Sequence, residues 1–287
     1  MGRSQVVRQR VLVPPFLGSN PSGPVFSLPS LPKSPLLVFD FDGVLVDGMP
    51  EYWWSARRAA LALDRGLQLP EQAPPAFALL RPRMHKGWEM VLLALEMGQA
   101  DHDLPAFQHD YDRALAKALT RQHLQPAVLQ QALESVRADA IATDLPAWLA
   151  RHRFYPGVAE RLGRFAEEGI GWAVLTTKGG AFASALLESA RLRPSAVYGH
   201  EDGSKPEVLL QLSEPGRPLW FVEDRRPTLE LVRVTPGLEA VRCFLVAWGY
   251  LAPNDAHGLP DGIHWLELAE FQRPLAAWSG PAKVRQY

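Results

Sequence analysis

The stretch LLVFDFDGVLVDG, residues 36–48, places two aspartates, Asp40 and Asp42, at the end of an apolar run. The run is continuous rather than alternating, which is typical of a strand buried on both faces of a parallel sheet. A glycine follows Asp42 directly, and a third acid, Asp47, comes shortly afterwards. Negative charge therefore collects at the tip of a buried strand, where it is costly unless it has a partner.

Further apolar runs predict further strands: GWAVLTT (171–177), SAVYG (195–199), PLWFVED (218–224) and AVRCFLVAWG (240–249). Helical stretches such as SKPEVLLQLSE and TLELVRVT separate them, and this alternation predicts an α/β fold, a doubly wound, Rossmann-like parallel sheet. Ligands of such sheets bind at the carboxyl ends of the strands. Polar residues end several of these runs, and we expect them to meet the two aspartates there: Thr176, Thr177, Glu223 and Asp224.

The segment between the first two strands has helical spacing throughout and is too long for a loop. We interpret residues 49–154 as a helical cap inserted after the first strand, and residues 36–48 and 155–275 as the core. A stabilising insertion away from the site is the alternative. Residues 1–35 contain no acid and are rich in Pro, Ser and Gly, which predicts a disordered leader. An organelle transit peptide is the alternative interpretation of its arginines.

The composition limits the classes of partner. The 287 residues carry a net charge of -1, so no global basic field favours nucleic acid or an anionic membrane. No apolar run approaches the ~20 residues that a membrane helix needs. The single cysteine, Cys243, cannot form an internal disulfide, which fits a reducing compartment and predicts a cytoplasmic protein. We expect a small-molecule substrate and neither a nucleic-acid nor a membrane partner.

The motifs resemble those of the haloacid dehalogenase-like hydrolases, in their phosphoglycolate phosphatase and β-phosphoglucomutase-like branch. DFDGVLVD (40–47) resembles the first motif of that family, and AVLTTK (173–178) is similar to the second. GSKPEVLLQL (203–212) resembles the third and WFVEDR (220–225) the fourth. FYPGVAERL (154–162) is similar to the turn by which the branch returns from its cap. Each motif is weak alone, but together they stand in the family's order.

The resemblance implies a phosphoryl-transfer mechanism with named residues. Asp40 would be the nucleophile that forms an aspartyl-phosphate, which divides a difficult hydrolysis into two steps. Asp42 would protonate the leaving alkoxide and then accept the proton of the attacking water. Thr176 would donate a hydrogen bond to the phosphoryl group, with Thr177 as the spare candidate. Lys205 would neutralise charge and position Asp40.

The same resemblance implies Mg²⁺ as cofactor, because two anions would otherwise repel each other. A hard cation of this kind takes oxygen ligands. The implied ligands are the Asp40 carboxylate, the backbone carbonyl of Asp42, and Glu223 with Asp224. Arg225 and Arg226 stand where the family usually has a small hydroxyl residue. These arginines either contact the substrate or face solvent.

Substrate choice is expected to depend on the cap. The stretch RPRMHKGWEM (81–90) gathers Arg83, His85 and Lys86 before a helix, which suits an anionic substrate; an ordinary basic loop is the alternative. We therefore predict a Mg²⁺-dependent phosphatase that acts on a small phosphorylated metabolite. A sugar-phosphate mutase of the same superfamily and a non-catalytic regulatory protein with this fold are the alternatives.

Overall fold

A computed structural model describes residues 34–99 and 103–279. The leader predicted over residues 1–35 lies outside the described residues, except for its last two positions. No helix within the described ranges combines the length and the apolar character that crossing a lipid bilayer requires.

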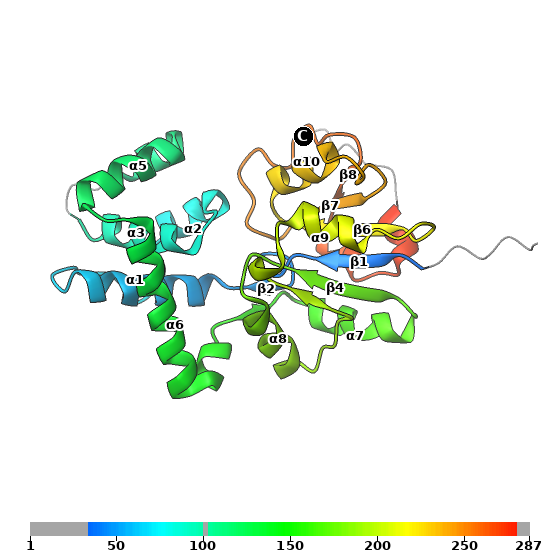
Figure 1. Ribbon diagram of the computed structural model, residues 1–287, viewed down its shortest axis with the longest axis horizontal. Coiled ribbons are helices and arrows are strands. Elements are labelled where there is room, and N and C mark those ends of the chain that lie inside the picture. Colours follow the sequence, from blue (N-terminus) through cyan, green and yellow to red (C-terminus); the bar gives the residue numbers. More distant parts are fainter. Residues whose placement is uncertain (1–33, 100–102, 280–287) are drawn as a thin grey trace, which may run out of the picture. The chain divides into compact units, whose positions relative to one another are not determined.

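A six-stranded sheet forms the centre of the fold, and its paired strands all run parallel (Figure 1). The strand order is β5-β4-β1-β6-β7-β8, so β1 lies between β4 and β6. The strands span Leu36–Phe39 (β1), Gly171–Leu175 (β4), Val197–Tyr198 (β5), Leu219–Glu223 (β6), Arg242–Val246 (β7) and Ile263–Leu266 (β8).

The register of β1 fixes which residues meet at the edge of the sheet. Phe39 pairs with Val174 of β4 on one side and with Val222 of β6 on the other. The Asp40 backbone N–H still donates to the Val222 carbonyl, at 2.9 Å. Asp40 therefore follows the last paired residue of β1 at the level where β4 and β6 also end.

Helices cover both faces of the sheet, because successive side chains of β1 point to opposite faces and all of them are buried. Leu37 and Phe39 pack with α7 (Val158–Glu167), α8 (Gly180–Ser189) and α11 (Leu268–Phe271). Leu36 and Val38 face the opposite side, where α9 (Lys205–Leu212) and α10 (Arg226–Val234) provide the apolar cover. The predicted doubly wound α/β fold is confirmed.

The chain from residue 49 to residue 152 is mainly helical and has a hydrophobic core of its own, with Trp53, Phe77 and Leu93 among its buried side chains. A short antiparallel pair, β2 (Val46–Asp47) and β3 (Arg153–Phe154), joins the chain where it leaves and returns. The helices are α1 (Met49–Leu63), α2 (Pro75–Leu80), α3 (Gly87–Met97), α4 (Leu104–His109), α5 (Tyr111–Gln122) and α6 (Pro126–Leu149). The domain boundaries given above stay a prediction.

Local details differ from the pattern in the sequence. The stretch LPAFQHDYDRALAKALTRQ is two helices, because the Asp110 backbone is not helical and its side chain accepts from the Arg113 N–H to begin α5. Helix α6 is broken at Asp144, just before Pro146, which cannot donate a backbone hydrogen bond. Helix α8 and strand β8 lie where the sequence analysis placed no element.

Candidate active site

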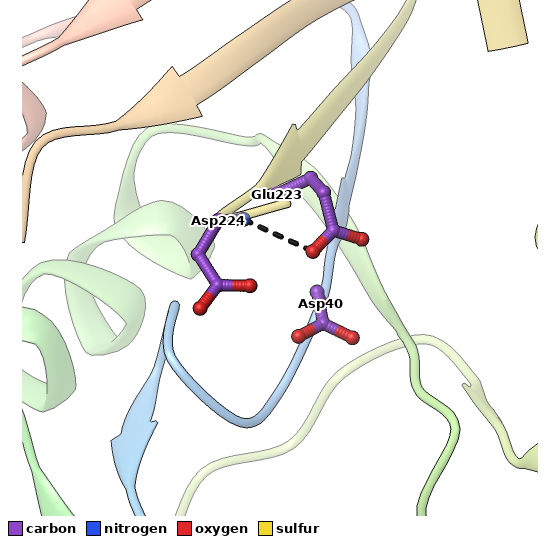
Figure 2. A group of neighbouring side chains, drawn as sticks. All are labelled: Asp40, Glu223 and Asp224. Atoms are coloured by element: carbon purple, nitrogen blue, oxygen red, sulfur yellow. Dashed lines mark hydrogen bonds between the residues drawn. The ribbon is translucent and has the colours of Figure 1, made fainter. Parts of the chain in front are cut away.

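Three carboxyl groups meet at the carboxyl edge of the sheet. Asp40 follows β1, Glu223 ends β6 and Asp224 comes directly after it, and all three are buried. Figure 2 shows their carboxyl groups converging, with one oxygen of each within 4.8 Å of the others. We call this group the carboxylate cluster. Its members come from distant parts of the sequence and meet because the parallel register ends β1 and β6 together.

Lys205 places its ammonium group against the carboxylate cluster. Its Nζ lies 2.5 Å from Asp40 Oδ1 and 2.5 Å from Glu223 Oε2. The residue stands in the first turn of α9, and the sequence explains why the helix begins there. Ser204 donates its hydroxyl to Glu207 at 2.7 Å and its backbone N–H to the same carboxylate at 2.8 Å, a capping box that fixes the helix start.

One ammonium does not compensate three buried carboxyl groups. Burial, opposed by Lys205 but reinforced by the charge of Glu223, raises the pKa of Asp40 to about 7. Burial and the charges of Glu223 and Asp40 raise the pKa of Asp224 well above its usual range. Burial also acts on Glu223, but the Lys205 ammonium outweighs it and holds the pKa of Glu223 below its usual value. The site is therefore short of positive charge.

The glycine of the opening motif is required by geometry. Gly43 has φ of +95°, a conformation that residues with a side chain rarely adopt. A Cβ atom at this position would lie 1.9 Å from Asp224 Oδ2. The loop after Asp40 can therefore pass the carboxylate cluster only with glycine here.

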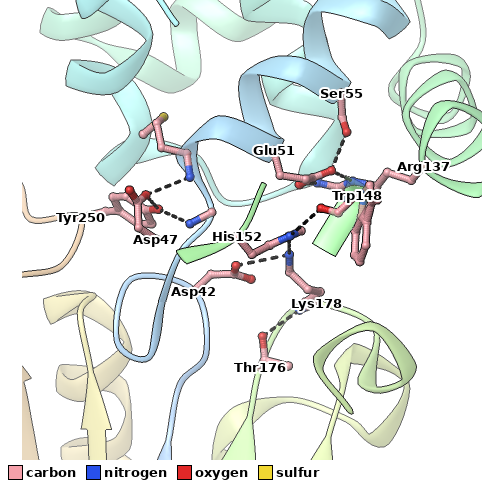
Figure 3. Close-up of polar contacts among 12 residues, drawn as sticks. Asp42, Asp47, Glu51, Ser55, Arg137, Trp148, His152, Thr176, Lys178 and Tyr250 are labelled. Atoms are coloured by element: carbon pink, nitrogen blue, oxygen red, sulfur yellow. Dashed lines mark hydrogen bonds and ion pairs between the residues drawn. The ribbon is translucent and has the colours of Figure 1, made fainter. Parts of the chain in front are cut away.

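The other residues predicted for catalysis lie around this edge. Thr176 follows β4 and is buried, and its Oγ1 accepts the Lys178 backbone N–H at 3.0 Å. Thr177 is exposed. The Asp42 side chain is 11% exposed, and its Oδ1 lies 3.3 Å from the Lys178 ammonium (Figure 3). The parallel sheet thus brings the ends of β1, β4 and β6 to one edge.

Comparison with known proteins agrees with this architecture. The phosphoglycolate phosphatase of Pseudomonas syringae pv. syringae (strain B728a) is 26% identical over 243 residues, which span 80% of this chain and 73% of the relative. A predicted phosphatase from Clostridium acetobutylicum has a TM-score of 0.51 at 15% identity, over 83% of this chain and 96% of that structure. The structure of the Mycobacterium tuberculosis Protein Tyrosine Kinase A also has a TM-score of 0.51, at 21% identity, over 86% of this chain and 100% of that structure. No protein-family model matches the sequence.

The two structures, at such low identity, show the fold alone. The sequence relative and the order of the motifs on the strand ends support the resemblance to a family. In sequence and in fold the chain resembles the haloacid dehalogenase-like hydrolases. The resemblance inferred from the motifs is thereby confirmed.

The carboxylate cluster has the donor chemistry of a magnesium site. Asp40 and Asp224 offer carboxylate oxygens, which are the ligands that hard cations prefer. The raised pKa values of Asp40 and Asp224 indicate that the cluster carries too little positive charge to keep both carboxyl groups ionised. A divalent cation would supply that charge. Glu223 is more heavily engaged, because its Oε2 binds Lys205 and its Oε1 accepts the N–H groups of Asp224 and Arg225. The donor set therefore fits Mg²⁺, with Asp40 and Asp224 as its most available carboxylates.

The residues predicted to bind substrate lie on the cap side. Arg83 and His85 are beside a cavity of about 410 Å³, which Arg225 of the core also lines. His85 Nδ1 is 2.5 Å from Arg225 Nη2, and burial together with the Arg225 charge lowers the pKa of His85. Lys86 is exposed and does not line this cavity. Among the described residues no hydrogen bond or ion pair joins Arg83, His85 or Lys86 to the carboxylate cluster, so their role stays a prediction.

Several residues near the site had no role predicted from the sequence. Lys178 contacts both Asp42 and His152. It follows directly after Thr176 and Thr177 in the sequence, and this position next to the predicted site could have identified it. The Arg81 guanidinium lies 4.8 Å from the centre of the Tyr52 ring and 4.5 Å from that of Tyr250. The pairing of Arg81 with these rings depends on tertiary structure, and periodicity gives no sign of it.

The chain segment that leads into the cap is held by Tyr250. The Tyr250 hydroxyl donates to Asp47 Oδ1 at 2.7 Å and accepts the Gly48 backbone N–H at 2.8 Å. Asp47 Oδ1 also accepts the Met49 N–H at 3.0 Å, at the start of α1. The third acid of the opening motif therefore fixes the turn into the cap and takes no part in the carboxylate cluster.

Proposed function

We propose that this protein is a Mg²⁺-dependent phosphatase that hydrolyses a small phosphorylated metabolite through an aspartyl-phosphate on Asp40. The observation that carries the proposal is the position of Asp40, at the tip of the central strand with Lys205 at 2.5 Å and the Glu223-Asp224 pair beside it. The name of the Pseudomonas relative, phosphoglycolate phosphatase, supports the same reaction class. The single cysteine, Cys243, is buried, and we propose a cytoplasmic location.

In the first step Asp40 attacks phosphorus, and the bond from phosphorus to the leaving oxygen breaks. Asp42 gives its proton to that oxygen, so the product leaves as an alcohol. Lys205 holds the Asp40 carboxylate in one orientation and offsets negative charge, and Thr176 donates its hydroxyl to a phosphoryl oxygen. Mg²⁺, when bound, would screen the repulsion between the carboxylate and the phosphoryl group.

In the second step water attacks the phosphorus of the aspartyl-phosphate, and Asp42 accepts the proton that the water loses. The bond from phosphorus to the Asp40 oxygen breaks, which restores the carboxylate and releases inorganic phosphate. The same two residues thus serve both steps, with Asp42 acting first as acid and then as base.

The test is a phosphatase assay over a panel of small phosphate esters, each measured in EDTA and in Mg²⁺. We expect release of inorganic phosphate from at least one ester in Mg²⁺ and none in EDTA. Asp40→Asn, which keeps the shape of the side chain and removes its charge, should be inactive on the same ester. Activity that is undiminished in EDTA, or that survives Asp40→Asn, would contradict the proposal.

A further inference from the structure

Lys178 carries a buried ammonium group beside the proposed acid/base. Its side chain is only 7% exposed, and its Nζ lies 3.3 Å from Asp42 Oδ1 and 3.1 Å from His152 Nε2 (Figure 3). The backbone at Lys178 is fixed as well, because its N–H donates to Thr176 Oγ1. Contacts therefore hold both the backbone of Lys178 and its ammonium group.

His152 is arranged to accept a hydrogen bond from this ammonium. Its Nδ1 lies 3.3 Å from the Trp148 carbonyl oxygen, which can only accept, so the ring proton belongs on Nδ1. The lone pair on Nε2 then faces Lys178. Burial and the Lys178 charge lower the pKa of His152 to about 4, so the ring is neutral at physiological pH.

Within the described part of the chain, Lys178 has no carboxylate other than Asp42 as a direct partner. Glu51 is the next acid nearby, but Arg137 binds both of its oxygens at 2.7 Å and Ser55 donates to one of them. The centres of the Tyr52 and Trp148 rings lie 5.5 Å and 6.0 Å from Lys178 Nζ and fill the space around it. Burying an ammonium is costly without polar partners, and Asp42 Oδ1 and His152 Nε2 are the partners that Lys178 has here.

We propose that Lys178 is a positioning residue for Asp42, and that His152 holds the Lys178 ammonium in place; the inference rests on the acid/base role proposed for Asp42. By pairing with Oδ1, Lys178 fixes the Asp42 carboxyl group, to which the Tyr52 side chain also makes a hydrogen bond. The Asp42 carboxyl group, held in this way, gives its proton to the leaving oxygen in the first step and accepts one from water in the second. Lys178 itself transfers no proton and touches no substrate.

The primary test is Lys178→Met, which keeps the length of the side chain and removes its charge, assayed on an alkyl phosphate and on p-nitrophenyl phosphate. A positioned proton donor is worth about 10²–10⁴ in rate, so the loss of its orientation should lower kcat on the alkyl ester about 10- to 100-fold. KM should change less than about 3-fold, because ground-state binding is untouched. The aryl ester, whose leaving group needs little protonation, should lose at most a few-fold.

Two further comparisons separate positioning from a merely structural role. Adding Lys178→Met to Asp42→Asn should cost nothing more, since the residue acts only through Asp42. Lys178→Arg keeps the charge and should retain most of the activity on the alkyl ester. His152→Gln keeps an acceptor and should resemble the wild type, whereas His152→Leu should show a smaller loss with the same dependence on the ester. Lys117→Met, at an exposed lysine of α5, is the matched control.

The outcomes that would overturn the proposal are distinct. A raised KM with unchanged kcat for Lys178→Met would make Lys178 a substrate-binding residue. Equal losses on both esters, or an undiminished loss in the Asp42→Asn background, would show that it does not act through Asp42. If Lys178→Met does not fold, as judged by circular dichroism, His152→Leu and Lys178→Arg give the same decision. A wild type that hydrolyses neither ester in Mg²⁺ would instead refute the proposed function.

Discussion

Asp40→Asn should abolish catalysis and at the same time stabilise the metal-free protein. Asp40 is 5% exposed and belongs to the buried carboxylate cluster. Burial, only partly offset by Lys205, raises its pKa from the usual 3.8 to about 7. Since a shift of one pKa unit corresponds to about 1.4 kcal/mol, the difference between 3.8 and about 7 corresponds to about 4 kcal/mol. Asparagine has no proton to lose and avoids this cost.

The sign of the pH dependence follows from proton binding. Between about pH 4 and pH 7 the folded protein keeps the Asp40 proton that the unfolded chain has already released. The contribution of Asp40 to the free energy of unfolding is therefore complete below about pH 4 and is lost as the pH rises to about 7. Asp40→Asn should match the wild type at pH 4 and be more stable by up to about 4 kcal/mol at pH 8.

Thermal unfolding in EDTA at a series of pH values measures this difference. For a protein of this size about 4 kcal/mol corresponds to a Tm difference on the order of 10 °C at pH 8. Asp139→Asn, at an exposed aspartate of α6, is the matched control and should follow the wild type at every pH. Adding Mg²⁺ at pH 8 should stabilise the wild type and leave Asp40→Asn nearly unchanged. The reasoning is wrong if Asp40→Asn is no more stable than the wild type at pH 8.

Three further predictions concern the acid/base, the metal and the cap. Asp42→Ala should lower kcat about 10²–10⁴-fold on alkyl phosphates and much less on aryl phosphates, and equal losses on both would count against its role. Asp224→Ala should raise the Mg²⁺ concentration for half-maximal activity at least about 10-fold, and an unchanged Mg²⁺ titration would remove Asp224 from the metal site. Arg83→Ala and Lys86→Ala should each lower kcat/KM about 10-fold for the natural substrate but leave p-nitrophenyl phosphate nearly unaffected, because that ester has no remote group to bind. Parallel losses on both esters would instead assign these residues to the fold or to the phosphate site.

The central strands and the carboxylate cluster were predictable from the sequence for the same physical reason. A strand buried on both faces is continuously apolar, so the first polar residue marks its end, as at Asp40 and Glu223. Parallel strands end at a common edge, so the residues that follow them meet without any knowledge of the loops. Strand β8 (Ile263–Leu266) gave a weaker signal, because His264 interrupts its apolar run.

Other features depend on tertiary structure and left little trace in the pattern. Helix α8 begins at Gly180, directly after Gly179, and two consecutive glycines are more typical of a loop. The contact between Lys178 and His152 joins the loop after β4 to the segment that returns from the cap. A pattern of apolar residues along the sequence cannot predict such a long-range pair. His85 meets Arg225 in the same way, from the cap side and the core side of one cavity.

The most direct test of the central claim is to trap the covalent intermediate. Asp42→Asn should slow the attack of water on the aspartyl-phosphate, so the intermediate should accumulate when this variant is mixed with an aryl phosphate and Mg²⁺ and quenched in acid. Mass spectrometry of the peptides then locates the added phosphoryl group. The account predicts that it lies on Asp40. A phosphoryl group on another residue, or phosphate release with no labelled peptide at any time, would contradict it.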